Sequence, residues 1–140
     1  MGAEPLFLDD EQLDAELALL GIPEEAEPRM EAAQLLRVAA IQAGLPRDAI
    51  ISSDIGNNCA IGNAYPTFEQ GRKYLAPGLF GPCGYGFPAI IGAKIGNPDV
   101  PVVGFAGDGA FGISMNEMSS SGRDEWPAVT MVIFRNYQWG

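Results

Sequence analysis

The sequence predicts one α/β domain with a parallel β-sheet flanked by helices. The chain has 140 residues, 47% of them apolar, which is enough for one domain with a real core and too few for two domains of ordinary size. Short β-rich runs alternate with segments of helical periodicity along most of the chain. A strand, a helix and a second strand in this order indicate a βαβ unit, in which the strands run parallel.

Two helices are predicted before the first strand. Residues 10–20 place leucines on one helical face, and Gly21 follows where a helix can end. Residues 30–43 repeat apolar positions at helical spacing, and Gly44 ends that segment. Each helix therefore has an apolar face to bury against a neighbour.

The acidity of the chain is concentrated at its N-terminus. The formal net charge is −10, and nine of the eighteen acidic residues fall within residues 1–28, which contain neither Lys nor Arg. We therefore expect residues 1–28 to be an acidic extension or linker and residues 29–140 to be the domain. Residues 29–140 are close to neutral and lack the basic patch that nucleic-acid binding needs, so DNA and RNA are not expected partners.

The domain is predicted to contain three strands and two further helices. Residues 49–53 form the first β-rich run, and the segment that follows, to about residue 80, fits no single pattern. Ten of the eighteen glycines then fall between residues 78 and 112, where they indicate close backbone approaches, because apolar runs interrupt them throughout. The remaining predicted elements are a helix at 87–94, a strand at 102–106, a helix at 113–121 and a strand at 128–134.

The most informative side chains stand where two of these strands end. Asp108, within Gly107-Asp108-Gly109, closes one strand, and Asn136, 27 positions beyond Gly109, closes the next. The carboxyl ends of parallel strands form the edge where open α/β sheets bind ligands. A carboxylate and an amide oxygen are hard ligands for Mg²⁺ or Ca²⁺, and the backbone carbonyl of Gln138 can reach the same ion. These residues predict a metal site that holds a phosphorylated ligand.

Glycines and backbone amides beside this carboxylate suit the phosphate groups of such a ligand. Gly107 and Gly109 let the backbone approach closely. The amides of Ala110 and Phe111 stand at the entry to the next helix, where they can donate to phosphate oxygens. The alternative is that the carboxylate only caps a helix between turn glycines and that Asn136 is a turn residue.

A competing motif lies upstream. Residues 84–89 fit the dinucleotide-binding pattern G-x-G-x-x-A through Gly84 and Gly86, with Asp108 at a suitable distance to bind a ribose hydroxyl of a nicotinamide cofactor. That pattern requires a strand immediately before it, whereas residues 76–83 contain two prolines and two glycines, which interrupt a strand. This alternative also leaves Asn136 unexplained.

The chain contains no histidine, which excludes Cys–His and Ser–His catalysis within it. Cys59 and Cys83 lack the spacing of a metal or redox motif, so we expect two reduced thiols in a reducing compartment. No long apolar run or basic leader is present. We therefore expect a cytoplasmic protein without a membrane-spanning segment.

The motifs of residues 29–140 resemble the diphosphate-binding domain of thiamine diphosphate enzymes. The family signature is GDG and, further along, an Asn pair; Arg135-Asn136 stands in place of that pair and keeps the second Asn, the metal ligand of the family. Residues 81–94 (GPCGYGFPAIIGAK) are similar to the family block that holds the aminopyrimidine ring. The resemblance implies thiamine diphosphate and Mg²⁺ as cofactors, with Gly81 accepting from the 4′-amino group and Cys83 replacing the apolar side chain that bends the cofactor.

Three stretches narrow the resemblance to one branch of the family. Residues 53–57, 81–94 and 134–140 are most similar to the sulfoacetaldehyde acetyltransferases. This branch implies a transferase that converts sulfoacetaldehyde and phosphate into acetyl phosphate and sulfite. Acetolactate synthase and other decarboxylases share the general motifs and remain alternatives, as does a non-catalytic partner chain.

The resemblance also implies a partner for the domain. In the family, the glutamate that activates the cofactor comes from a pyrimidine-binding domain of the same or another subunit, and no such domain precedes residue 29. The chain ends at Gly140, before the later elements of the family's fold. We therefore expect a thiamine diphosphate-binding fold that is incomplete at its C-terminus. Such a fragment would be inactive alone, with no catalytic residue of its own, and would belong to a homo-oligomer when full length.

Overall fold

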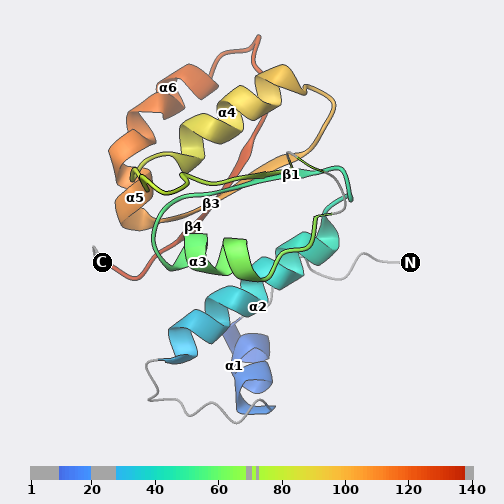
Figure 1. Ribbon diagram of the computed structural model, residues 1–140, viewed down its shortest axis with the longest axis vertical. Coiled ribbons are helices and arrows are strands. Elements are labelled where there is room, and N and C mark those ends of the chain that lie inside the picture. Colours follow the sequence, from blue (N-terminus) through green and yellow to red (C-terminus); the bar gives the residue numbers. More distant parts are fainter. Residues whose placement is uncertain (1–9, 20–27, 69–70, 72, 138–140) are drawn as a thin grey trace. The chain divides into compact units, whose positions relative to one another are not determined.

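The computed structural model describes residues 10–19, 28–68, 71 and 73–137 (Figure 1). The chain divides into two compact units. The first contains Met1–Leu45 and Ile61–Pro66, and the second contains Pro46–Ala60 and Thr67–Gly140.

Two helices make up most of the first unit. The helix α1 spans Asp10–Leu19 and α2 spans Pro28–Gly44, which confirms both predicted helices to within two residues at each described end. They pack through a small apolar cluster in which Leu17 of α1 is 1% exposed and lies with Ala33 of α2. Gly21, the predicted terminator of the first helix, lies outside the described residues.

The second unit is built on a parallel sheet, as the sequence predicts. Four strands form it among the described residues, in the order β2-β1-β3-β4, and every neighbouring pair is parallel. The strands predicted at 49–53, 102–106 and 128–134 are confirmed, while β2 was not predicted because a strand of two residues shows no alternating pattern. Their bounds are Ile50–Ser53 for β1, Tyr74–Leu75 for β2, Val102–Gly107 for β3 and Thr130–Phe134 for β4.

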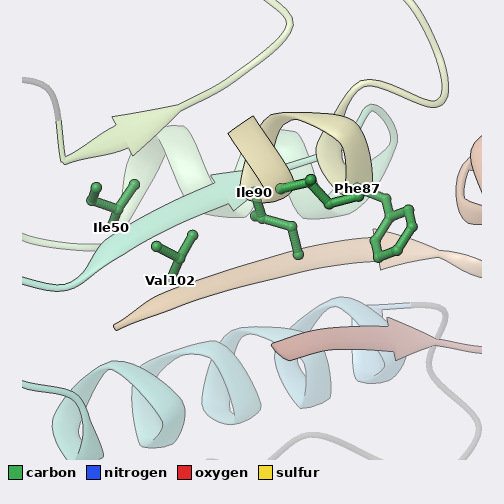
Figure 2. Close-up of a cluster of buried hydrophobic side chains, with 5 residues drawn as sticks. Ile50, Phe87, Ile90 and Val102 are labelled. Atoms are coloured by element: carbon green, nitrogen blue, oxygen red, sulfur yellow. The ribbon is translucent and has the colours of Figure 1, made fainter. Parts of the chain in front are cut away.

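The helix α4, at Gly86–Gly96, confirms the predicted helix and packs on β1 and β3 (Figure 1). In Figure 2 the side chains of Phe87 and Ile90 reach from α4 toward β3, and the same buried cluster includes Ile50 on β1 and Val102 on β3. Ile90 is completely buried in this cluster, so its truncation to Ala would cost roughly 2–5 kcal/mol. This apolar layer fixes the N-terminal end of α4 above the carboxyl ends of the strands.

The helical segment after β3 begins earlier than predicted. The sequence placed a helix at residues 113–121, whereas α5 begins at Asp108, directly after the strand. The glycines at 107, 109 and 112 suggested a loop, but Gly107 is extended and acts as the N-cap, and an acidic first residue suits a helix N-terminus. The ring of Phe111 also packs edge-on against Phe87, with centroids 5.4 Å apart, which ties this short helix to α4.

Shorter helical segments complete the described chain. They are α3 at Asn57–Ala64, the 3₁₀ turn η1 at Met115–Glu117 and α6 at Met118–Ser121, together with α5 at Asp108–Ser114. The sequence predicts no element for the segment that includes α3, and its glycines and asparagines disfavour a helix. The boundary between the two compact units runs through α3, after Ala60.

Candidate cofactor-binding site

The two polar side chains singled out from the sequence follow neighbouring strands. Gly107, the last residue of β3, is paired with Phe134, the last residue of β4. Asp108 therefore begins α5 beside the point where the chain leaves β4 toward Asn136, and both side chains are half-buried. The topology thus brings the carboxylate and the amide to one edge of the sheet. Gln138, the predicted third ligand, lies outside the described residues.

The turn after β4 is shaped by a stacked pair. Arg135 stands where the family has its first Asn, and its guanidinium lies 3.9 Å from the ring centroid of Tyr137. Tyr137 adopts a φ of 61°, a left-handed conformation that non-glycine residues rarely take. This left-handed residue follows Asn136 directly.

A buried amide that the sequence reasoning missed lies beside the Gly107 turn. Asn58 is 5% exposed, and its Oδ1 has no hydrogen-bond partner among the described residues. Its Nδ2 would lie 3.7 Å from a Cβ built on Gly107. A buried polar atom without a partner indicates a ligand, ion or water at that place. The sequence signal was a pair of asparagines after Gly56, which does not separate a ligand contact from a helix start.

A second missed residue is Asp54, which follows β1 directly. Its side chain is completely buried. Oδ1 accepts hydrogen bonds from the amides of Ile55, at 2.8 Å, and Gly84, at 3.0 Å, and Oδ2 accepts one from Gly86, at 2.7 Å. An ionised carboxylate only accepts hydrogen bonds, so three amide donors are a matched environment for it.

These hydrogen bonds hold the glycine-rich segment that leads into α4 and ends at its first residue, Gly86; we call this segment the 81–86 loop. Gly81 and Gly84 have φ values of 58° and 84°, which favour glycine. A Cβ on Gly81 would lie 3.2 Å from Ile55 Cδ1, and one on Gly84 would lie 2.8 Å from Ile113 Cγ2 in α5. The loop is therefore held between the end of β1 and α5. Cys83, at its centre, is exposed.

The dinucleotide-binding alternative does not fit this geometry. Among the described residues, no strand leads into Gly84: β2 ends at Leu75, and turns and irregular backbone fill the interval before α4. The amides of Gly84 and Gly86, which would face a pyrophosphate in that motif, donate to Asp54 instead. The glycines of this segment thus serve a close internal contact.

The described residues contain no cluster of three or more Cys, Asp or Glu side chains that could hold a metal by itself. A cation at Asp108 and Asn136 would therefore need backbone and ligand oxygens as well, which is how Mg²⁺ is held beside phosphates. The two cysteines form no disulfide with each other, and Cys59 is buried.

One titratable group beside β1 is perturbed. Tyr74 lies in β2, and burial raises the pKa of its hydroxyl to about 12, while the side chain of Ser53 works in the opposite direction. The Tyr74 hydroxyl has no hydrogen-bond partner among the described residues. The Ser53 hydroxyl donates to the Asp54 carbonyl, at 3.0 Å. Tyr74 is therefore neutral at physiological pH.

A parallel sheet with glycine-rich turns and polar side chains along its carboxyl edge defines an α/β domain of the cofactor-binding class. The family model of the thiamine pyrophosphate enzyme C-terminal TPP binding domain matches residues 54–140, and the chain belongs to this family. The match begins at Asp54 and includes the 81–86 loop, the Gly107 turn and Asn136.

Curated proteins of known name show which members of this family the chain is similar to in sequence. The chain is 76% identical over 121 residues to a "Probable sulfoacetaldehyde acetyltransferase" of Rhizobium meliloti (strain 1021), covering 86% of this chain and 20% of the relative. It is 80% identical over 101 residues to the sulfoacetaldehyde acetyltransferase of Roseovarius nubinhibens, covering 72% of this chain and 17% of the relative. The acetolactate synthase isozyme 1 large subunit of Escherichia coli (strain K12) is 33% identical over 104 residues, covering 74% of this chain and 18% of that protein. The chain thus spans about a fifth of the length of the curated relatives it matches.

A solved structure shares the fold. The thiamine diphosphate-dependent 4-hydroxybenzoylformate decarboxylase of Rhodococcus jostii RHA1 matches with a TM-score of 0.67 and 27% sequence identity, covering 76% of this chain and 20% of that chain. The predicted fold class is confirmed by this match and by the parallel sheet. No helix within the described ranges is long and apolar enough to cross a membrane.

Proposed function

We propose that this chain is the diphosphate- and Mg²⁺-binding part of a thiamine diphosphate-dependent acyltransferase that converts sulfoacetaldehyde and phosphate into acetyl phosphate and sulfite. The observation that carries the proposal is the contrast in identity between branches of one family. Three relatives named for sulfoacetaldehyde acetyltransferase are 76%, 80% and 77% identical, whereas two named for acetolactate synthase are 34% and 33% identical.

The proposed metal site uses the shared edge of β3 and β4. Asp108 offers an anionic oxygen and Asn136 a neutral one, and the carbonyl of Gln138 is the proposed third protein ligand. Mg²⁺ prefers about six oxygens in an octahedral arrangement, so diphosphate oxygens and water can complete the shell. The half-buried position of both side chains supports this assignment, because a bound ion remains in reach of solvent and ligand.

The proposed diphosphate contacts surround the same place. The glycines at 107 and 109 permit close approach, and the amides of Ala110 and Phe111 lie in the first turn of α5, where they can donate to phosphate oxygens. The buried amide of Asn58 is a further candidate donor, because its Nδ2 would lie 3.7 Å from a Cβ built on Gly107, beside the proposed diphosphate site.

The aminopyrimidine is proposed to lie against the 81–86 loop. The carbonyl of Gly81 would accept from its 4′-amino group, and the exposed side chain of Cys83 would contact the bent cofactor. Bound thiamine diphosphate supplies carbanion chemistry that no protein side chain provides. This chain's residues bind and orient it, which agrees with a catalytic role that needs no histidine.

The proposed partner is a pyrimidine-binding domain, in the same or another subunit, which supplies the activating glutamate. We propose a cytoplasmic homo-oligomer in which this domain and that partner form the complete site. The chain's exposed apolar residues at 79 and 80 support a covered surface near the 81–86 loop, since exposed clusters of this kind often mark contacts.

Two measurements test the proposal on the protein that carries this chain. Isothermal titration calorimetry should detect thiamine diphosphate binding that requires Mg²⁺. Together with the pyrimidine-binding partner, the protein should release sulfite from sulfoacetaldehyde only when phosphate is present. Turnover of pyruvate, without sulfite release from sulfoacetaldehyde, would instead support an acetolactate synthase-like or decarboxylase function.

Alternatives of another class give separate results in the same experiments. NAD binding that is indifferent to Mg²⁺ would support the nicotinamide-binding module built on Gly84, Gly86 and Asp108. Failure to bind either cofactor, with retained assembly onto a second chain, would support a non-catalytic partner.

A further inference from the structure

We propose that Asp54 is a positioning residue for the aminopyrimidine ring: its buried carboxylate holds the 81–86 loop in the shape that presents Gly81 and Cys83 to the cofactor. The inference rests on the proposed function, because it assumes that this loop contacts the ring.

Asp54 is fixed to the sheet through its backbone. Its amide donates to the carbonyl of Phe105 in β3, at 2.8 Å, and its carbonyl accepts from the Ser53 hydroxyl, at 3.0 Å. Its side chain is completely buried. The carboxylate is thus a fixed point at the end of a central strand.

From this fixed point the carboxylate reaches residues 30 and 32 positions further along the chain. Oδ1 accepts from the amide of Gly84 and Oδ2 from the amide of Gly86, at 3.0 and 2.7 Å. The amide of Ile55 also donates to Oδ1, at 2.8 Å. Every partner is a donor, so both oxygens must be acceptors.

The close approach of the loop depends on this arrangement. A Cβ on Gly86 would lie 3.1 Å from the Cβ, the amide nitrogen and Oδ2 of Asp54, so only glycine lets the amide come this near without displacing its neighbour. Gly81 lies close to the side chain of Ile55, the residue that follows Asp54, because a Cβ on Gly81 would be 3.2 Å from Ile55 Cδ1. The turn after β1 therefore supports the loop at both ends, and Cys83 lies between the supports.

An asparagine at position 54 has the same shape but cannot satisfy the loop. One end of its amide is a donor, and in either orientation that donor faces at least one backbone N–H. A buried donor left without an acceptor is costly, so the loop is expected to move away from the β1 turn. The Mg²⁺ and diphosphate contacts at Asp108 and Asn136 belong to β3 and β4 and are expected to persist.

The experiment compares two ligands by calorimetry on the protein that carries this chain: thiamine diphosphate with Mg²⁺, and inorganic pyrophosphate with Mg²⁺. Asp54→Asn should weaken thiamine diphosphate binding at least about tenfold, as expected for losing one buried hydrogen bond, while the pyrophosphate dissociation constant changes less than about twofold. Hydrogen exchange should accelerate at the amides of Gly84 and Gly86. Asp99→Asn, which changes an exposed aspartate, should leave all three measurements unchanged.

A second variant covers the case in which Asp54→Asn does not fold. Gly86→Ala keeps the charge but presses a methyl group on the carboxylate, and it should lower thiamine diphosphate affinity selectively. Gly92→Ala, in the same helix with open space around its Cβ, is the matched control. Equal losses for both ligands, or an unchanged thiamine diphosphate affinity in a folded variant, would overturn the positioning role. If the unaltered protein binds pyrophosphate but not thiamine diphosphate, the proposed function itself fails.

Discussion

Two aspartates occupy equivalent places in this sheet and have different environments. Asp54 follows β1 and Asp108 follows β3, and these two strands are direct neighbours. Asp54 is completely buried and accepts three backbone hydrogen bonds, whereas Asp108 is half-buried at the first position of a helix. A carboxylate at the end of a parallel strand is therefore not by itself a ligand site. At Asp54, the loop that returns to the strand end supplies backbone donors that engage the carboxylate.

The largest expected effect comes from changing Asp108, the half-buried aspartate at the proposed metal site. Asp108→Ala should reduce Mg²⁺-dependent thiamine diphosphate binding on the order of 100-fold or more, above the ~10–100-fold typical of losing an outer partner of a metal site. The melting temperature without ligand should fall only slightly, because an acidic residue at a helix N-terminus contributes about 0.3–1 kcal/mol. Calorimetry with and without Mg²⁺ checks this, and undiminished affinity would remove Asp108 from the metal site.

The next largest effect is on the free energy of unfolding and concerns the 81–86 loop, which binds the buried Asp54. Gly84→Ala should destabilise the protein by about 1–3 kcal/mol more than Gly78→Ala, the usual range for overpacking. Both glycines have a positive φ, so both variants pay for backbone strain, but only at Gly84 would the new Cβ meet a neighbour, Ile113 Cγ2, at 2.8 Å. Urea unfolding of the two variants measures the difference. Equal losses would show that α5 yields to the added methyl group.

A smaller effect tests whether Asn136 is a ligand at the proposed metal site beside Asp108. Asn136→Ala should raise the Mg²⁺ concentration needed for half-maximal cofactor binding by about tenfold, because a neutral amide oxygen binds the cation less strongly than a carboxylate. The free energy of unfolding should fall by no more than about 1.5 kcal/mol, the upper end for one typical hydrogen bond, because the side chain is half-buried. Mg²⁺ titration at saturating thiamine diphosphate provides the measurement. A normal Mg²⁺ requirement would make Asn136 a turn residue.

The smallest effect is the pH dependence of stability that Tyr74, in the strand beside β1, contributes. The raised pKa of Tyr74 favours the neutral hydroxyl in the folded protein, so its contribution to stability is complete below pH 10 and is lost as pH rises toward 12. Tyr74→Phe should flatten the fall in the urea midpoint between pH 10 and 12, relative to the unaltered protein. An unchanged slope would mean that other groups dominate alkaline unfolding.

The longer strands and helices could be predicted from the sequence, whereas the shortest elements and the role of Asp54 could not. It found β1, β3, β4 and α4, because each is long enough to show its own periodicity. It missed β2, which has two residues, and placed the start of α5 too late, because three glycines concealed a helix that packing of Phe111 on Phe87 stabilises. Asp54 was visible only as a residue between a strand and a turn, since its partners stand 30 and 32 residues away.

The sequence by itself determined the parallel α/β class and the placement of Asp108 and Asn136 after the ends of two strands, because strand periodicity and the residues that end each strand are local properties of the chain. Tertiary structure alone decided which aspartate is used internally. Burial and the approach of backbone donors depend on how residues 54, 84 and 86 come together in space, and no local pattern records that approach.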